Sequence, residues 1–384
     1  MRTDVIMGAR VGAAGYTDSD ALRPGARIFI SPAGSVVAGR RLCYNNEVKK
    51  LSFGKSQTVV RQMKRCAIVW LLALCLLLAG CGAQEAQEAR IEEPPILLGF
   101  SQLGWESAWR LANTQSIKSA ADAAGVTLMY DNAEQKQERQ IKAIRSFIAY
   151  QVDVIAFSPI VETGWDNVLQ EAKDAGIPVL TTDRMISTQD ESLYAGFIGS
   201  DFRQEGIAAG EFLIEKAQGR ELNIVELSGT LDSTPMLHRA EGFREAIAGH
   251  DNLKLIDSMS GDFLRPKGRE CMKVLLEKHD RIDVLYSHND AMTLGAISAL
   301  EDAGLVPGED VIIITVDGEQ AAIDLLKEGR INCVVECKPQ IGETVMELAE
   351  KLAAGEEIPR YTYSEERVFS EFDDDLDAIA PRGY

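Results

Sequence analysis

The sequence predicts an α/β protein made of two domains of similar size, each with a mainly parallel sheet. From residue 96 onward, short apolar runs rich in β-branched residues alternate with amphipathic stretches of helical period, a pattern typical of strand–helix–strand units. The apolar runs are nearly continuous, as expected for strands that helices cover on both faces. They form two sets, and the break between the sets lies near residues 198–204.

Strands are expected at eight places in these two sets, with helices between them. One of the helices, at 135–150, carries Ile141, Ile144 and Phe147 on a single face. Further along, a strand at 331–338, a helix at 339–354 and a strand at 361–370 are expected to return to one domain or the other. The eight strands are expected at residues 96–101, 126–131, 153–158, 177–183, 222–229, 253–261, 283–289 and 311–317.

A short apolar segment ahead of these domains predicts export. Residues 66–79 carry no charge and follow two basic residues. The segment is shorter than the roughly 20 residues that a membrane span needs, and it has the length of the apolar core of a signal peptide. It ends in LAGC at residues 78–81, which resembles a bacterial lipobox, in which the cysteine becomes the lipid-bearing first residue. A cleaved signal with an incidental cysteine and a plain membrane anchor are the alternatives.

The N-terminal part of the chain is therefore divided in three. Because a signal peptide works from the start of a chain, we hypothesise that translation begins at Met63 and that residues 1–62 are an extension assigned in error. That extension shows no sustained helical or strand period. Residues 63–80 are then a lipoprotein signal peptide, and residues 81–95 are the lipidated Cys81 with a polar, acidic tether.

Charge and cysteine usage exclude several classes of function. The chain has a net charge of −19, and without residues 1–80 it keeps 28 basic (40 − 12) and 55 acidic (59 − 4) residues, a net charge of −27. So acidic a domain is not expected to bind nucleic acid, whose phosphates require a positive surface. Three cysteines lie in the two domains and make no disulfide framework. The four histidines show no metal-ligand spacing, so neither a metal site nor a cofactor is expected, and the cysteines are read as buried thiols.

Polar and aromatic side chains follow the expected strands at their carboxyl ends, where open parallel sheets bind ligands. The mixture suits a neutral ligand with many hydroxyl groups. Carboxylates accept hydrogen bonds from hydroxyls, guanidinium groups donate to sugar oxygens, and aromatic faces pack against C–H groups. Taken singly, each residue has another reading as a surface ion pair, a core aromatic or a turn. The candidates are Ser101, Glu106, Trp109, Arg110, Ser158, Asp183, Arg184, Arg239, Phe263, Asn289 and Asp317.

Several long stretches carry a resemblance to a known family. They include GFSQLGWESAWR, TGWDNVLQEAKDAGIPVLTTDR, SGDFLRPKG, HNDAMTLGAI and the closing RGY. From about residue 96 to its end, the chain resembles the sugar-binding proteins of bacterial ABC transporters, of the ribose-binding type, and among these the proteins for galactofuranose. Two positions depart from the pattern: His238 stands where an acidic residue is usual, and Trp105 where the residue is small.

The resemblance implies a type I periplasmic binding protein with two Rossmann-like lobes and a hinge of three crossovers, near residues 202, 338 and 357. Lobe 1 would comprise 96–202 plus 338–356, and lobe 2 would comprise 203–337 plus 357–384. It also implies that the eleven candidates above contact the ligand, and that Glu336 lies at the hinge, where ribose-binding relatives use Gln.

The function implied is capture of a monosaccharide, galactofuranose or galactose-like, and its delivery to an ABC permease. We expect a monomer outside the cytoplasm, either periplasmic or lipid-anchored to the outer face of the cell membrane through Cys81. The alternative is a sensor subunit that presents sugar to a receptor kinase or chemoreceptor. An enzyme is not expected, since no G-x-S-x-G elbow, P-loop or dinucleotide fingerprint is present.

Overall fold

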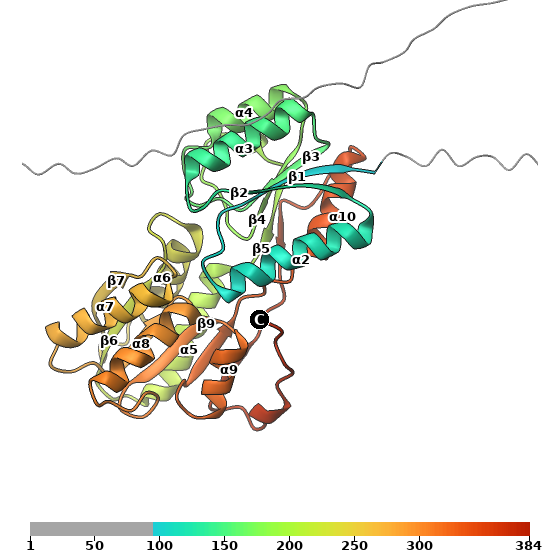
Figure 1. Cartoon of the computed structure of the whole chain (residues 1–384). Coiled ribbons are helices and arrows are strands. Elements are labelled where there is room, and N and C mark those ends of the chain that lie inside the picture. Colours follow the sequence, from blue (N-terminus) through green and yellow to red (C-terminus); the bar gives the residue numbers. More distant parts are fainter. Residues whose placement is uncertain (1–94) are drawn as a thin grey trace, which may run out of the picture. The chain divides into compact units, whose positions relative to one another are not determined.

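The computed structural model describes residues 95–384, so Met63, Cys81, the signal peptide and most of the tether lie outside the described residues. The described part contains two six-stranded sheets, each covered by helices, which form two lobes (Figure 1). The predicted α/β class is confirmed. Within residues 95–384, no helix has both the length and the apolar character that crossing a membrane requires.

The first lobe is built on an entirely parallel sheet in the order β11-β5-β4-β3-β1-β2. Helices α3 and α4 cover one face of it, and α2 and α10 cover the other (Figure 1). The strands are β1 (Leu97–Gln102), β2 (Thr127–Asn132), β3 (Val154–Phe157), β4 (Val179–Thr182), β5 (Gly196–Gly199) and β11 (Tyr361–Tyr363); the helices are α2 (Ala108–Ala124), α3 (Gln137–Tyr150), α4 (Asp166–Asp174) and α10 (Gly342–Ala353).

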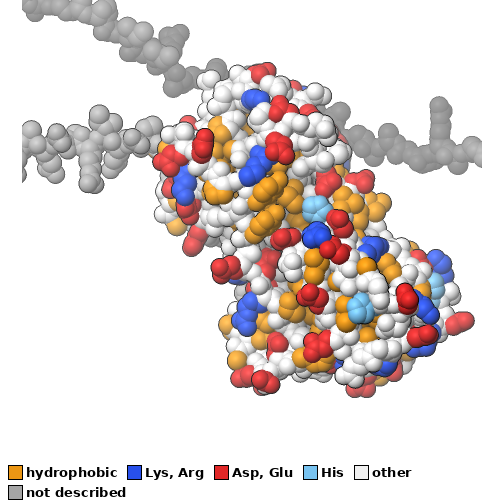
Figure 2. Space-filling model, turned by 180° about the vertical axis from the view of Figure 1, so that it is seen from behind, with side chains coloured by type: hydrophobic (Ala, Val, Ile, Leu, Met, Phe, Trp, Pro, Cys, Tyr) orange, Lys and Arg blue, Asp and Glu red, His pale blue; other side chains and the backbone are white. Residues whose placement is uncertain are grey.

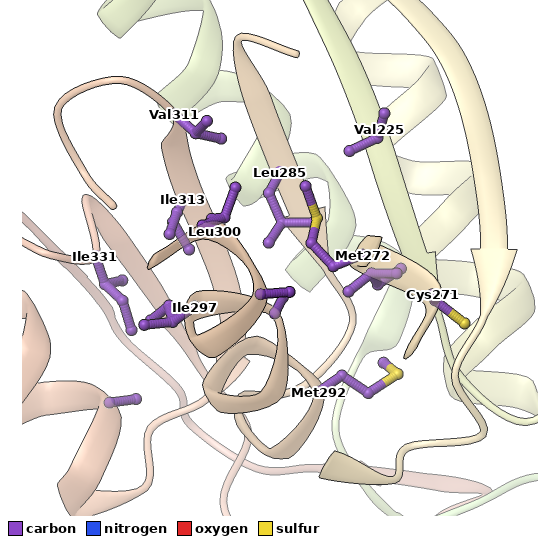
Figure 3. Packing of buried hydrophobic residues seen from close by; sticks show 14 of the residues in the cluster. Val225, Cys271, Met272, Leu285, Met292, Ile297, Leu300, Val311, Ile313 and Ile331 are labelled. Atoms are coloured by element: carbon purple, nitrogen blue, oxygen red, sulfur yellow. The ribbon is translucent and has the colours of Figure 1, made fainter. Parts of the chain in front are cut away.

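The second lobe repeats the plan in the order β12-β10-β9-β8-β6-β7, with β12 antiparallel to β10. Helices α7, α8 and α9 pack on one face, where Leu285 and Ile313 of the sheet meet Met272 and Leu300 of the helices (Figure 3); α5 and α6 pack on the other. The strands are β6 (Leu222–Ser228), β7 (Leu253–Ser260), β8 (Val284–Ser287), β9 (Ile312–Asp317), β10 (Cys333–Glu336) and β12 (Val368–Ser370); the helices are α5 (Phe202–Ala217), α6 (Thr234–Ile247), α7 (Arg265–Lys278), α8 (Asp290–Asp302) and α9 (Gln320–Lys327).

The structure confirms the eight strands predicted in the two sets, and it adds β5. That strand has only four residues and begins and ends with glycine, so it lacks the apolar run that the pattern requires. Both glycines are needed for close packing: a Cβ on Gly196 would lie 2.7 Å from the carbonyl oxygen of Pro359, and one on Gly199 would lie 2.9 Å from that of Asp183.

The predicted strand at 361–370 is wrong, because the chain forms two short strands there in different sheets. Tyr361–Tyr363 pairs with β5 in the first lobe, and Val368–Ser370 pairs with β10 in the second. The third crossover therefore lies between residues 363 and 368 and not near 357, and residues 361–363 belong to lobe 1. Backbone hydrogen bonds on both sides fix the switch, from Ser364 to Gly199 and from Glu336 to Arg367.

Acidic side chains are spread over the face of the described residues seen in Figure 2, among fewer basic ones, and that face shows no continuous basic surface. This agrees with the charge balance of the sequence, in which Asp and Glu outnumber Lys and Arg by 59 to 40.

Candidate ligand-binding site between the lobes

A hollow with an empty volume of about 330 Å³, including solvent at its mouth, lies between the two lobes. Nine of the twelve predicted site residues line it, and they come from both lobes. The lining residues are Glu106, Ser107, Trp109, Arg110, Asp183, Arg184, Phe202, Pro235, Arg239, Phe263, Asn289, Asp317 and Cys337.

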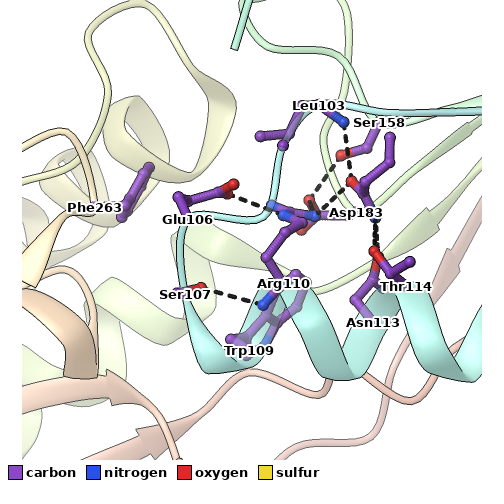
Figure 4. Close-up of polar contacts among 12 residues, drawn as sticks. Leu103, Glu106, Ser107, Trp109, Arg110, Asn113, Thr114, Ser158, Asp183 and Phe263 are labelled. Atoms are coloured by element: carbon purple, nitrogen blue, oxygen red, sulfur yellow. Dashed lines mark hydrogen bonds and ion pairs between the residues drawn. The ribbon is translucent and has the colours of Figure 1, made fainter. Parts of the chain in front are cut away.

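Arg110 is the centre of the first lobe's contribution (Figure 4). Its Nη1 lies 2.6 Å from Oδ2 of Asp183, and its Nε lies 3.0 Å from Oε1 of Glu106. Burial alone would lower the pKa of Arg110, but these two carboxylates raise it above its usual value. Ser107 begins helix α2 as its N-cap, accepting a hydrogen bond from the Arg110 amide, and so fixes the turn that aims the guanidinium.

The charge of Arg184 is compensated less well than that of Arg110. Its Nη1 donates to the carbonyl of Ile160 (3.1 Å), and its guanidinium carbon lies 5.3 Å from the ring centroid of Phe263, which belongs to the other lobe. Burial and the neighbouring Arg110 lower the pKa of Arg184 to about 10. Among residues 95–384, its buried Nε has no hydrogen-bond partner, and the same is true of Oε2 of Glu106. One donor and one acceptor on the first lobe's side of the hollow thus remain unsatisfied.

Arg239 holds the corresponding position in the second lobe. Its Nε donates to Oε2 of Glu205 and its Nη1 to the carbonyl of His288, both at 2.6 Å. Burial would lower the pKa of Arg239, but Glu205 raises it well above the usual value. Glycine allows this pairing, because helix α5 approaches α6 so closely that a Cβ on Gly206 would lie 2.3 Å from the carbonyl oxygen of Arg239.

Three site residues have backbone dihedrals that non-glycine residues rarely adopt. The φ angles are 62° at Asp183, 61° at Phe263 and 125° at Asp317. Such conformations cost on the order of 1–3 kcal/mol each and persist only where the surroundings enforce them, often at functional sites. At Asp317, burial and the neighbouring Asp290 also raise the pKa of the carboxyl well above its usual value.

Three predicted site residues do not line the hollow. Ser158 lies behind it and donates to Oδ2 of Asp183 (2.8 Å), so it orients that carboxylate. Ser101 is buried, and its hydroxyl has no hydrogen-bond partner among the described residues. Glu336 forms an ion pair with Arg382 and accepts from the Arg367 amide (3.0 Å), so it joins the second and third crossovers.

Four lining residues were missed by the sequence analysis. Phe202 and Cys337 follow β5 and β10, so the strand-end argument would have found both had it been applied to these two strands. Ser107 and Pro235 line the hollow from the starts of helices α2 and α6, where the sequence signals only a cap and a first helical turn.

The two lobes touch on both sides of the hollow, so the structure is a closed form. The backbone amide of Trp109 donates to Glu319 (3.2 Å), and its indole N–H donates to the carbonyl of Cys337 (2.6 Å). On the other side, the amide of Met185 donates to Oγ1 of Thr234 (3.1 Å). Trp109 therefore anchors the closed form in addition to lining the hollow.

Glu226 predicts how the second lobe responds to acid. It accepts from Oγ of Ser258 (2.6 Å) and lies 3.0 Å from Nε2 of His288, whose carbonyl holds Arg239. Burial would raise the pKa of Glu226, but the hydrogen bonds lower it from 4.5 to about 2. A lowered carboxyl pKa stabilises the fold above the unfolded value and loses this effect as pH falls, here between pH 4.5 and 2. The loss is on the order of 3 kcal/mol.

The measurement is the free energy of unfolding by urea at pH 7, 5 and 3. Burial also lowers the pKa of His288, so the unfolded state takes up a proton at this histidine more readily than the folded state. His288 and Glu226 therefore both make the fold less stable as the pH falls. Glu226→Gln should be less stable than the unmodified protein at pH 7, and its stability should fall less between pH 5 and 3. Equal losses in the two proteins would contradict the role given to Glu226.

Comparison with known proteins places the chain in a family. The profile of the periplasmic binding protein domain matches residues 98–357. The galactofuranose-binding protein YtfQ of Escherichia coli (strain K12) is 43% identical over 260 residues, which are 67% of this chain and 82% of that protein. A structure from Mycobacterium smegmatis in complex with β-D-fucofuranose is 47% identical with a TM-score of 0.72, covering 74% of this chain and 93% of the other.

A further solved structure is similar to this chain in the same way. The periplasmic binding protein component of the arabinose ABC transporter from Shewanella sp. ANA-3, bound to α- and β-L-arabinofuranose, is 40% identical with a TM-score of 0.71, covering 73% of this chain and 93% of the other. The predicted two-lobe fold and the resemblance read from the motifs are both confirmed. This chain belongs to the periplasmic binding protein family.

Proposed function

We propose that this protein captures a monosaccharide in the hollow between its lobes, most favourably in a furanose form, and delivers it to an ABC permease. The observation that carries the proposal is a pair of buried atoms at the hollow, Nε of Arg184 and Oε2 of Glu106, which have no hydrogen-bond partner within residues 95–384. One is a donor and the other an acceptor. A hydroxyl group can both donate and accept, so a polyhydroxyl ligand satisfies both atoms without bringing a charge.

The charges around the hollow favour a neutral sugar over a sugar acid or phosphate. Arg110 is already paired with Asp183 and Glu106, and Arg239 is paired with Glu205. An added anion would meet these carboxylates. Guanidinium groups fixed by ion pairs still have N–H donors for sugar oxygens, and such charge-assisted hydrogen bonds are roughly twice as strong as neutral ones.

The furanose preference rests on the relatives. Galactofuranose, β-D-fucofuranose and L-arabinofuranose are the ligands named for proteins that are 40–47% identical to this chain. Contacts from both lobes give a ligand its preference for the closed form, and this preference shifts the population from open to closed. YtfQ is a binding protein by name, and the Shewanella protein is by name the binding component of an ABC transporter; this favours transport over the sensor alternative and over an enzyme.

Calorimetric titration of the full chain with monosaccharides tests the proposal. D-galactose, D-fucose and L-arabinose, which equilibrate with furanose forms, should bind, and the sugar should be recovered unchanged by mass spectrometry. D-galactitol is the matched control, since it has the hydroxyls but cannot close a ring. Absence of binding for every monosaccharide, or equal binding of galactitol, would contradict the proposal.

We also propose that the mature protein is a monomer tethered to the membrane by a lipid on Cys81. The support is the LAGC sequence at residues 78–81, directly after the apolar segment. Intact mass of the native protein should give a chain that starts at Cys81 and carries acyl groups. Cys81→Ser should release the protein from the membrane fraction or leave it unprocessed. A native chain that retains residues 1–62 would contradict this assignment.

A further inference from the structure

Three ligand-type side chains from distant parts of the sequence meet beside the hinge. Glu205 is in the first turn of α5, Cys337 directly follows β10, and Glu366 is in the third crossover. One potential ligand atom of each lies within 4.8 Å of the other two. Glu205 is 3% and Cys337 is 2% exposed, and Glu366 is partly buried, so this is not a solvated acidic surface.

The Glu205 carboxylate has an unused oxygen in this cluster. Its Oε2 accepts from Nε of Arg239 (2.6 Å), whereas Oε1 is buried and has no hydrogen-bond partner among the described residues. A buried acceptor without a partner costs about 1–3 kcal/mol, and more when it is charged. The Glu205 carboxylate, which lies beside a thiol and a second carboxylate, therefore has an oxygen whose lone pairs are unused.

The charge balance of the cluster matches a divalent cation. With Glu205, Glu366 and Cys337 ionised, the three carry three negative charges, and Arg239 offsets one of them. Without an ion, burial raises the pKa of Cys337 well above its usual value and that of Glu366 to about 8, so both groups keep their protons at neutral pH and a bound cation has to displace them. An ion of charge +2 brings the four groups to zero.

We propose that Glu205, Cys337 and Glu366 bind a divalent cation of the zinc class. A thiolate with two carboxylates suits Zn²⁺ and disfavours Mg²⁺ and Ca²⁺, which prefer oxygen ligands alone. In tetrahedral zinc sites, metal–sulfur distances of about 2.3 Å and metal–oxygen distances of about 2.0–2.2 Å put the ligand atoms roughly 3.5 Å apart. The ligand atoms lie within 4.8 Å of one another, so the cluster needs a contraction of at most about 1.3 Å to reach this. Ser200, whose hydroxyl lies 3.3 Å from Sγ of Cys337, borders the fourth position.

Such an ion would link parts that move during opening and closing. Cys337 and Glu366 are in the second and third crossovers, and Ser200 of the first crossover already hydrogen-bonds to Glu366. Glu205 is also the partner of Arg239, which lines the sugar hollow. Metal at the hinge is therefore expected to raise thermal stability whether or not sugar is bound, which separates this proposal from the proposed transport function.

The spacing of the four histidines predicted no metal site, and this cluster contains no histidine. Cys337 and Glu366 both lie more than one hundred residues after Glu205 in the chain. They meet Glu205 because the chain returns through the hinge. No spacing motif signals such a site.

Cobalt is the probe for the test, since Co²⁺ takes zinc sites and reports a thiolate ligand by a charge-transfer absorption in the near ultraviolet. The untagged full chain is stripped with EDTA, then titrated with Co²⁺ and, separately, with Zn²⁺. We expect each chain to bind about one equivalent of Co²⁺, with a cobalt–thiolate absorption band, and this binding should depend on Cys337. Zn²⁺ should raise the Tm.

Variants identify the ligands. Cys337→Ser should lose the cobalt–thiolate band and the zinc-induced rise in Tm, and Glu366→Gln should weaken Co²⁺ binding by at least about tenfold. Cys333→Ser is the matched control, since Cys333 is also buried, lies on the same strand and is outside the cluster. Absence of the band in the unmodified protein, or its persistence in Cys337→Ser, would overturn the proposal. If Cys337→Ser does not fold, Glu366→Gln, which keeps the shape of the side chain, provides the test: unchanged Co²⁺ affinity in that variant would overturn the proposal.

Discussion

Asp183→Asn should abolish measurable sugar binding, with a loss of at least about 100-fold in affinity. The carboxylate of Asp183 is shared by Arg110 at 2.6 Å, by the Ser158 hydroxyl at 2.8 Å and, at 3.9 Å, by Arg184. The substitution leaves Arg110 with Glu106 as its remaining ionic partner, and breaking a buried ion pair costs up to about 3–5 kcal/mol. Arg110 and Arg184 both line the hollow, so the substitution disturbs the orientation of two guanidinium groups and also removes the Asp183 acceptor.

The measurement is calorimetric titration with the sugar that binds the unmodified protein, alongside urea unfolding. We expect the variant to fold, with lower stability and unchanged far-ultraviolet circular dichroism. Glu171→Gln is the matched control, because Glu171 also pairs with an arginine, Arg145, but on the exposed surface; it should bind sugar normally. Retained affinity in Asp183→Asn would show that this carboxylate is not part of the binding site.

Arg239→Met should also abolish sugar binding. A second substitution can separate this effect from the loss of stability. Arg239 is the main cation of the second lobe's side of the hollow, and its removal leaves Glu205 buried without its partner. We expect a loss of affinity of at least about 100-fold and a loss of stability of about 3–5 kcal/mol.

The double variant Arg239→Met with Glu205→Gln separates binding from folding. Removing both charges should recover most of the stability, because no uncompensated ion remains, while sugar binding should stay absent. Urea unfolding and calorimetry on the single and double variants give both quantities. Recovery of sugar binding in the double variant would mean that Arg239 serves the fold and does not contact the ligand.

The strands could be predicted where burial on both faces imposes a continuous apolar run. Residues 153–158 and 311–317 are of this kind, and the structure forms β3 and β9 there. Strand β5 could not be found in this way, because close packing against Pro359 and Asp183 requires glycine at both of its ends. The polar residues SEER at 364–367 mark a break between the two short strands, but nothing local to them indicates that the strands join different sheets.

The site was largely predictable because parallel strands deliver their following residues to one end of the sheet. This rule found Arg110, Asp183, Arg239 and Asp317. The rule could not identify the residues that hold these side chains in place, because such contacts depend on distances in space. Ser158 orients Asp183 from behind, and Glu205, which fixes Arg239, lies in a helix 34 residues earlier in the chain.

The most direct test of the account is a crystal structure of the protein with the sugar that binds most tightly in the titrations. The account predicts one sugar ring between the lobes, in contact with Arg110 and Asp183 on one side and with Arg239 and Asp317 on the other. Its hydroxyls should satisfy Nε of Arg184 and Oε2 of Glu106. A sugar held by one lobe alone, or bound away from this hollow with those two atoms still unpartnered, would contradict it.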